Sequence, residues 1–144
     1  MNADIVKLSW EKFEIDMQKL AATIEDAIKV LGIPNPVLYG PPRGGLCIAV
    51  KLSHLLGIPV TLNEAEGTIW VDDVFETGRT VQENFELYPK ALRFTWVSKR
   101  NDVPFLYDFV QLVDPTSWII FPWENADKAE ADANEYYASR NIEL

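Results

Sequence analysis

Two adjacent carboxylates, those of Asp72 and Asp73, end an apolar run and lead into a turn rich in threonine and glycine. Adjacent acids at a strand end can bind ribose hydroxyls and a hard cation, and Mg²⁺ is the usual ion at such sites. The turn offers backbone amides, two hydroxyls and a helix amino terminus to a phosphate. The alternative is an acidic strand end with threonine as a helix cap, but the order of apolar strand, acids and turn favours a ribose phosphate site. The turn consists of Thr77, Gly78, Arg79 and Thr80.

A second loop, residues 40–45, has the sequence Gly-Pro-Pro-Arg-Gly-Gly between a predicted strand and a predicted helix. Free backbone amides, the helix dipole and the Arg43 guanidinium converge there, which suits an anion. The alternative is a stiff Pro-Pro turn whose glycines allow tight packing. The loop matches neither the dinucleotide-binding GxGxxG pattern nor the P-loop pattern, which disfavours a Rossmann site and a Walker-type nucleotide triphosphatase.

The elements that must position these loops alternate between helix and strand. Apolar residues recur at three- and four-residue steps over residues 9–31, which predicts an amphipathic helix capped by Ser9. The alternation predicts an α/β fold, a mostly parallel twisted sheet flanked by helices, with ligands beyond the carboxyl ends of its strands. The predicted strands are residues 37–39, 58–62, 68–74, 91–98 and 107–113, and the other predicted helices are residues 46–56, 80–88 and 125–140.

Length and composition limit the remaining possibilities. A chain of 144 residues with 48% hydrophobic residues suffices for one core, so we expect a single domain over residues 1–144. The formal net charge of −9 disfavours a nucleic-acid surface and adhesion to anionic lipid. The longest strongly apolar run, residues 118–123, is too short for a membrane span, and the amino terminus lacks the apolar core of a signal peptide. We therefore expect a cytoplasmic protein.

Metal-binding options are also narrow. The sequence holds one cysteine, Cys47, and one histidine, His54, so neither an internal disulfide nor a structural zinc site can form within one chain. Any metal must be held by carboxylates.

Both loops resemble motifs of one known family. The acid-pair loop resembles the phosphoribosyl-pyrophosphate motif of type I phosphoribosyltransferases, and residues 42–46, Pro-Arg-Gly-Gly-Leu, resemble their pyrophosphate loop. Residues 8–21, 87–91 and 116–124 are similar to segments of bacterial xanthine-guanine phosphoribosyltransferases. The resemblance covers nearly the whole chain and implies the type I phosphoribosyltransferase fold.

The resemblance also implies roles for individual residues. Pro42, Arg43 and Gly44 would hold pyrophosphate, and in this family the bond corresponding to Pro42-Arg43 is often a cis peptide. Asp72 and Asp73 would bind the ribose hydroxyls and Mg²⁺. The ribose 5-phosphate site would be completed by Glu76, Thr77, Gly78, Arg79 and Thr80.

Three further residues match the base-binding residues of the family. Lys99 matches the lysine that reads the purine 6-oxo group, Trp118 matches the aromatic residue that stacks on the ring, and the carbonyl of Ile119 would read position 2. Glu76 stands where 6-oxopurine enzymes usually carry an aspartate near N7, which makes it the candidate catalytic proton acceptor. Without the resemblance, a strand-end lysine is usually solvated and a tryptophan usually belongs to the core.

The implied reaction transfers 5-phosphoribose from phosphoribosyl pyrophosphate to a 6-oxopurine (guanine, xanthine or hypoxanthine) with release of pyrophosphate, in purine salvage. Mg²⁺ would be the cofactor, and the resemblance implies a homo-oligomer, a dimer or a tetramer. The alternative is a nucleotide- or phosphoribosyl-binding module of the same fold with weak or no transferase activity.

One departure from the family favours that alternative. Only residues 63–67 connect the predicted strand 58–62 to the acid-pair strand, where the family carries a long flexible loop that closes over the reaction centre. Solvent exclusion protects a cationic ribose from water. The short connection therefore predicts slow turnover, hydrolytic leakage or a lid from another chain.

Overall fold

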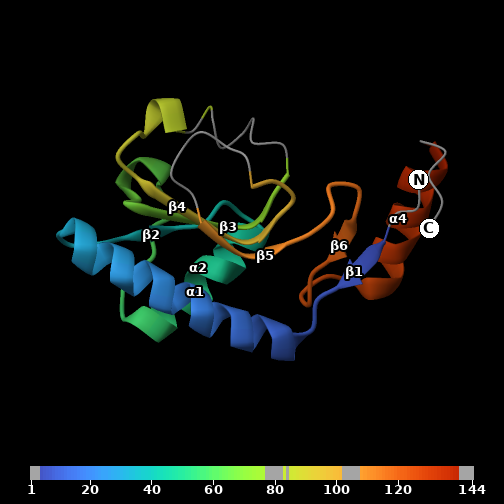
Figure 1. The fold of residues 1–144 in the computed structure, drawn as a ribbon, viewed down its shortest axis with the longest axis horizontal. Helices are drawn as coiled ribbons and strands as arrows, with labels where there is room; N and C mark the ends of the chain where they lie inside the picture. Colours follow the sequence, from blue (N-terminus) through green and yellow to red (C-terminus); the bar gives the residue numbers. More distant parts are fainter. Residues whose placement is uncertain (1–3, 77–82, 84, 102–107, 140–144) are drawn as a thin grey trace. The chain divides into compact units, whose positions relative to one another are not determined.

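The computed structural model describes residues 4–76, 83, 85–101 and 108–139. The chain forms two compact units, which we describe separately: residues 16–113, and residues 1–15 together with 114–144. Figure 1 labels the elements. They are β1 (Ile5–Lys7), α1 (Trp10–Leu31), β2 (Leu38–Tyr39), α2 (Gly44–Leu56), η1 (Glu64–Glu66), β3 (Ile69–Phe75), β4 (Leu92–Ser98), β5 (Asp108–Leu112), β6 (Trp118–Ile120) and α4 (Ala126–Ser139).

The larger unit contains a four-stranded sheet with the order β2-β3-β4-β5. Each neighbouring pair is parallel, with Leu38 opposite Ile69 in the first pair and Asp72 opposite Thr95 in the second. Parallel pairing brings the carboxyl ends of all four strands to one edge of the sheet. The prediction of a mostly parallel sheet is confirmed.

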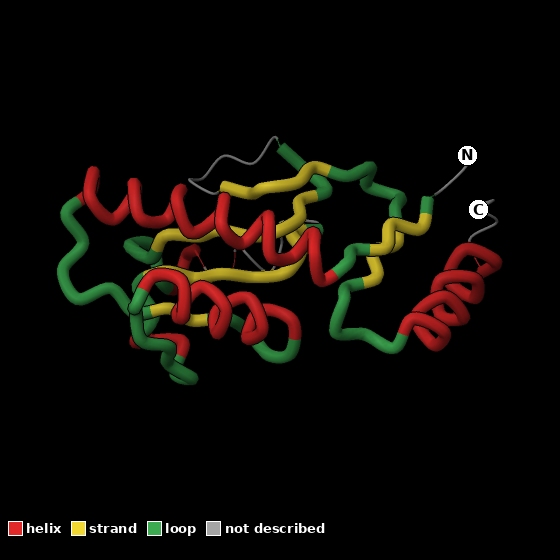
Figure 2. The backbone as a smooth tube through the Cα atoms, turned by 90° about the horizontal axis from the view of Figure 1, so that it is seen from below, coloured by secondary structure: helices red, strands yellow, loops and turns green. Residues whose placement is uncertain are grey.

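Helices α1 and α2 lie on one side of this sheet, and both stand in front of the strands in Figure 2, which is seen from below. Alternate residues of a strand face the same side, and those of β3 that face α2 include the buried Ile69 and Val71. Their burial against helix side chains forms the core of this unit. The buried helix residues are Met17, Leu20, Ala21 and Ile24 of α1 and Ile48, Ala49 and Leu52 of α2.

A buried polar contact ties α1 to the sheet. The carboxylate of Asp16 is fully buried and accepts a hydrogen bond of 2.8 Å from the indole Nε1 of Trp96 on β4. A buried carboxylate requires such a donor, because it has lost its hydration. The start of α1 is capped as predicted, since Ser9 Oγ accepts a hydrogen bond from the backbone amide of Lys12.

The connection at residues 63–67 is an ordered turn near the amino end of β3. The Asn63 side chain accepts a hydrogen bond of 3.1 Å from the Ala65 amide, and the Tyr88 hydroxyl donates one of 3.4 Å to Glu64 Oε1. Gly67 lies so close to Tyr39 that an added Cβ would come within 2.6 Å of the tyrosine Cβ. This turn is therefore packed at the end of β3 opposite to the carboxyl edge of the sheet.

The smaller unit contains β1 and β6, which pair in parallel with Val6 opposite Ile119, and the helix α4. The prediction that the strands end at residue 113 is wrong, because β6 is a strand as well, and β1 was not predicted. Both strands have three residues, which is too short for an alternating pattern to stand out. Their pairing joins chain segments far apart in sequence, which no local signal reports.

Other boundaries differ slightly from prediction. The predicted strand 58–62 is reduced to one bridge between Val60 and Leu38, flanked by Pro59, which has no amide to donate. Helix α2 begins two residues earlier than predicted, at Gly44. Of the predicted helix 80–88, Glu83 and residues 85–87 are helical, and residues 80–82 and 84 lie outside the described part.

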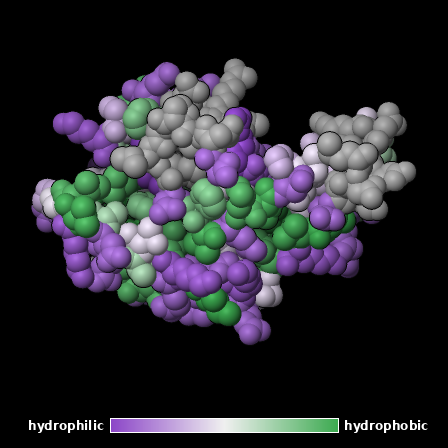
Figure 3. All heavy atoms as spheres, viewed as in Figure 1, coloured by the Kyte–Doolittle hydropathy of each residue, from purple (hydrophilic) through white to green (hydrophobic). Residues whose placement is uncertain are grey.

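The face drawn in Figure 3 carries both hydrophilic and apolar side chains, and the apolar ones gather mainly across its middle. Among the described residues, Val30, Leu62 and Leu87 are the most exposed large apolar side chains. None of the described helices combines the length and apolar character needed to cross a membrane.

Candidate active site

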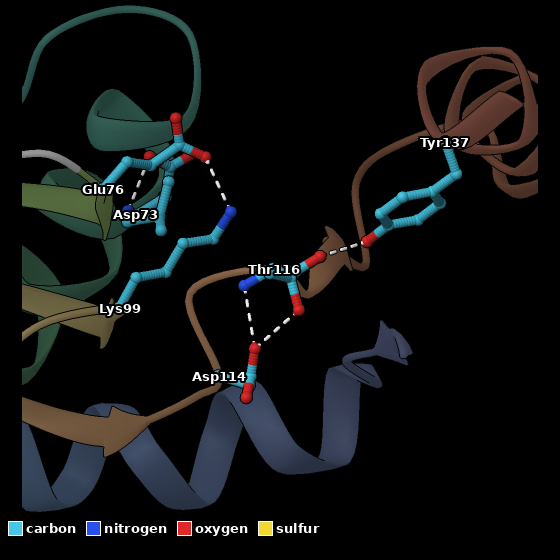
Figure 4. Close-up of polar contacts among 7 residues, drawn as sticks. Asp73, Glu76, Lys99, Asp114, Thr116 and Tyr137 are labelled. Atoms are coloured by element: carbon cyan, nitrogen blue, oxygen red, sulfur yellow. Dashed lines mark hydrogen bonds and ion pairs between the residues drawn. The ribbon is translucent and has the colours of Figure 1, made fainter. Parts of the chain in front are cut away.

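Asp72 and Asp73 lie in the second half of β3, close to the carboxyl edge of the sheet. Both side chains are partly buried, and each carboxylate accepts a hydrogen bond of 2.8 Å from the next backbone amide. The Asp73 amide donates to the Asp72 carboxylate, and the Val74 amide donates to the Asp73 carboxylate. The bond to Asp73 is drawn in Figure 4. These two local hydrogen bonds fix the orientation of each carboxylate.

The two acids meet the amino terminus of α2. A Cβ built on Gly44 would lie 1.9 Å from Asp73 Oδ2, and one built on Gly45 would lie 2.9 Å from Asp72 Oδ1. Only residues without a side chain leave room for carboxylates this close to the first turn of the helix. The structure thus brings the two loops singled out in the sequence into direct contact.

The electrostatics of the pair follow from burial and proximity. Burial, followed by the neighbouring charge of Asp73, raises the pKa of Asp72 to about 8. Burial also raises the pKa of Asp73, while hydrogen bonds from Asp72 and from backbone amides oppose that change. A cation at this point would favour the ionised form of both acids.

The donor set fits Mg²⁺. The acids supply hard oxygen ligands, and Mg²⁺ is usually held by one or two carboxylates together with substrate phosphates. Within the described part of the chain, no group of three or more histidine, cysteine, aspartate or glutamate side chains could hold a metal ion.

A second charged pair lies at the same edge. The Lys99 amide donates to the Phe75 carbonyl at 2.9 Å, which sets Lys99 beside the residue that follows β3. Its ammonium Nζ lies 3.1 Å from Glu76 Oε1, as Figure 4 shows. The side chain of Lys99 is 14% exposed and that of Glu76 is 59% exposed, so the lysine is held against the protein and the acid projects outward.

The remaining predicted site residues divide into three groups. The Pro42-Arg43 peptide bond is cis, and Arg43 is exposed at the N-cap of α2. Trp118 and Ile119 lie on β6 of the smaller unit. The predicted phosphate-binding residues Thr77, Gly78, Arg79 and Thr80 lie outside the described residues.

Two features of the site were not apparent from the sequence. Cys47 lies in the first turn of α2, and burial, followed by the charge of Asp73, raises the pKa of its thiol. The direct ion pair between Glu76 and Lys99 joins residues 23 positions apart, and only the parallel pairing of β3 with β4 brings them together.

Comparison with known proteins finds a phosphoribosyltransferase that is similar in sequence to this chain. No family model matches the chain. The chain is 35% identical, over 145 residues, to a xanthine-guanine phosphoribosyltransferase from Gluconobacter oxydans (strain 621H). The alignment covers 83% of this chain and 84% of that protein.

Solved structures share the architecture. A purine phosphoribosyltransferase from Pyrococcus horikoshii Ot3 superimposes with a TM-score of 0.65 and 26% identity, covering 85% of this chain and 95% of the other. The Helicobacter pylori xanthine-guanine-hypoxanthine phosphoribosyltransferase gives a TM-score of 0.64 at 17% identity, over 88% and 98% of the two chains, which concerns the fold alone. This chain belongs to the type I phosphoribosyltransferase family, whose members are pentosyltransferases.

Proposed function

We propose that this protein transfers 5-phosphoribose from phosphoribosyl pyrophosphate to N9 of a 6-oxopurine, as a step of purine salvage. The observation that carries the proposal is the Lys99–Glu76 pair, with its 3.1 Å contact, at the same sheet edge as Asp72 and Asp73. An ammonium can donate to a 6-oxo group and the adjacent carboxylate can accept a proton from N7. Guanine, xanthine and hypoxanthine all present these two groups.

The proposed roles of the remaining residues follow from their chemistry. Arg43 and the first amides of α2 would bind the pyrophosphate, because a guanidinium and a helix amino terminus both favour anions. Asp72 and Asp73 would bind the ribose hydroxyls and hold Mg²⁺, which supplies positive charge to the leaving pyrophosphate. The 5′-phosphate would be bound by Thr77, Gly78, Arg79 and Thr80.

Two further residues proposed to bind the base, Trp118 and Ile119, lie on β6. Trp118 would stack on the purine, and the carbonyl of Ile119 would accept from the group at position 2. Trp118 donates its amide to Asp4, and the Ile120 carbonyl accepts from Leu8, so β6 pairs with β1 through these two residues. Because parallel pairing uses alternate residues, the Ile119 carbonyl faces away from β1.

The chemical step then balances as follows. The bond from C1′ to the pyrophosphate oxygen breaks, and its electron pair leaves with pyrophosphate. The N9 lone pair forms the new bond to C1′, and the Glu76 carboxylate accepts the proton that the purine loses from N7. The protein contributes mainly orientation and charge neutralisation.

The ordered turn at residues 63–67 favours a second candidate, a phosphoribosyl- or nucleotide-binding module with little transfer. This turn is fixed by contacts of Asn63, Glu64 and Gly67 at the opposite end of β3 from the acids. We further expect a cytoplasmic homo-oligomer, a dimer or a tetramer, whose mass light scattering would measure.

Base selectivity tests the proposal. With phosphoribosyl pyrophosphate and Mg²⁺, guanine or hypoxanthine should be used at least tenfold better than adenine, whose 6-amino group would meet the Lys99 ammonium. Lys99→Ala should reduce that preference by about tenfold, because a buried unmatched polar contact costs about 1–3 kcal/mol. Lys90→Ala, at an exposed lysine before β4, is the matched control. A preference for adenine, or an unchanged preference in Lys99→Ala, would exclude the 6-oxopurine assignment.

A further inference from the structure

Two consecutive tyrosines of α4, Tyr136 and Tyr137, contact Trp118, the first residue of β6. The ring centroid of Tyr136 lies 5.1 Å from that of Trp118, and the centroid of Tyr137 lies 6.5 Å from it. Tyr137 is fully buried together with Ala133, and Trp118 packs against this cluster while remaining partly exposed. The indole is thus supported by α4 and still has surface available for a ligand.

The backbone before Trp118 is fixed by polar contacts as well. Asp114 Oδ1 accepts hydrogen bonds from the Thr116 amide at 2.9 Å and from the Thr116 hydroxyl at 2.6 Å. From the other side, the buried Tyr137 hydroxyl donates to the Thr116 carbonyl, and Figure 4 shows Tyr137 and Asp114 bonded to the same residue. Thr116 is therefore bonded through its amide, its hydroxyl and its carbonyl.

We propose that Tyr137 is a positioning residue for the purine, acting through Thr116 on Trp118 and Ile119, and that Tyr136 supports the Trp118 ring. This inference rests on the proposed function, because it assigns base binding to β6. Only two residues separate Thr116 from Ile119, so a change in its carbonyl orientation moves the strand that carries both base contacts. The phosphoribosyl pyrophosphate site of the larger unit uses none of these groups.

This separation gives the proposal a kinetic signature. Tyr137→Phe keeps the buried ring and removes the hydroxyl that bonds Thr116. We expect it to raise the KM for guanine and the Kd for GMP by about three- to tenfold, the effect of one lost hydrogen bond. The kcat and the KM for phosphoribosyl pyrophosphate should stay within twofold of wild type. Tyr88→Phe, which removes a tyrosine hydroxyl bonded to Glu64 in the larger unit, should leave all these constants unchanged.

A second variant keeps the test decisive if Tyr137→Phe unfolds. Tyr136→Ala removes the partly exposed ring beside Trp118 and should raise the guanine KM in the same selective way, and Tyr136→Phe should restore it. Equal changes in both KM values and in kcat, or an unchanged guanine KM in both Tyr137→Phe and Tyr136→Ala, would overturn the inference.

Trp118→Ala separates this inference from the proposed function. If Trp118→Ala weakens GMP binding, measured calorimetrically, while the tyrosine variants do not, the positioning role alone is wrong. If the wild-type protein binds neither GMP nor guanine, or if Trp118→Ala binds them as tightly as wild type, the proposed base site itself is wrong.

Discussion

Replacing Gly44 by alanine tests the contact between the acid pair and the first turn of α2. The new Cβ would lie 1.9 Å from Asp73 Oδ2 and 2.5 Å from its Cγ. Carbon and oxygen atoms that are not bonded rarely approach within about 3 Å, so the carboxylate must move by roughly 1 Å. The backbone itself accepts alanine, because Gly44 is helical and its φ is not positive.

The expected result is a loss of binding without a large change in stability. A displacement of about 1 Å at a positioned group can cost on the order of 100-fold. We therefore expect Gly44→Ala to weaken Mg²⁺-dependent binding of phosphoribosyl pyrophosphate by about that factor in isothermal titration calorimetry. The helix propensity of alanine, at most about 1 kcal/mol better than that of glycine, acts against the cost of moving the carboxylate, so urea unfolding should show a stability within about 1 kcal/mol of wild type.

Gly57→Ala is the matched control, since its Cβ meets nothing within 4 Å but its φ is +68°. It should lower the free energy of unfolding by about 1–2 kcal/mol and leave binding unchanged, the opposite pattern. If Gly44→Ala binds phosphoribosyl pyrophosphate as tightly as wild type, Asp72 and Asp73 do not bind this ligand in the positions seen in the structure.

Two other perturbations test the electrostatics and the core. The folded-state pKa of Asp72, about 8, lies above its ordinary value of 3.8, so the folded protein binds more protons than the unfolded chain between these pH values and its stability falls as pH rises. Asp72→Asn should flatten this dependence of stability on pH and raise the Tm at pH 8. A steeper dependence, measured by thermal unfolding across pH 5–9, would contradict this expectation. Asp26→Asn, on the exposed side of α1, serves as the control. Trp96→Phe removes the indole donor to the buried Asp16 and should cost about 1–3 kcal/mol in urea unfolding, and a cost near zero would show that this hydrogen bond does not stabilise the packing of α1.

The fold was predictable where the local pattern was strong. The helical period of residues 9–31 predicted α1, and the apolar run ending in Asp72 and Asp73 predicted β3. The β1 and β6 strands were missed because each is short and their pairing depends on distant residues. The predicted strand around Val60 is only a bridge, because Pro59 removes a donor and the chain turns at Asn63.

In the candidate site too, some features follow from the local sequence and others depend on the tertiary structure. Residue types and order identified the acid pair and the glycine loop, because strand ends of a parallel sheet meet at one edge. The contact of Gly44 with Asp73 and the ion pair of Glu76 with Lys99 depend on strand register and side-chain length, which the sequence does not specify. The bond of the Tyr137 hydroxyl to the Thr116 carbonyl joins residues 21 positions apart, and no local sequence pattern predicts it.

The most direct measurement of the central claim is the product ratio of a reaction containing phosphoribosyl pyrophosphate, guanine and Mg²⁺, followed by ³¹P NMR. Transfer predicts GMP and pyrophosphate in equal amounts, with ribose 5-phosphate as the product of any hydrolytic leakage. The Asp72→Asn, Asp73→Asn double variant should abolish GMP formation. Failure of the wild-type protein to form a nucleotide from guanine, xanthine or hypoxanthine, or nucleotide formation by the double variant at the wild-type rate, would contradict the assignment.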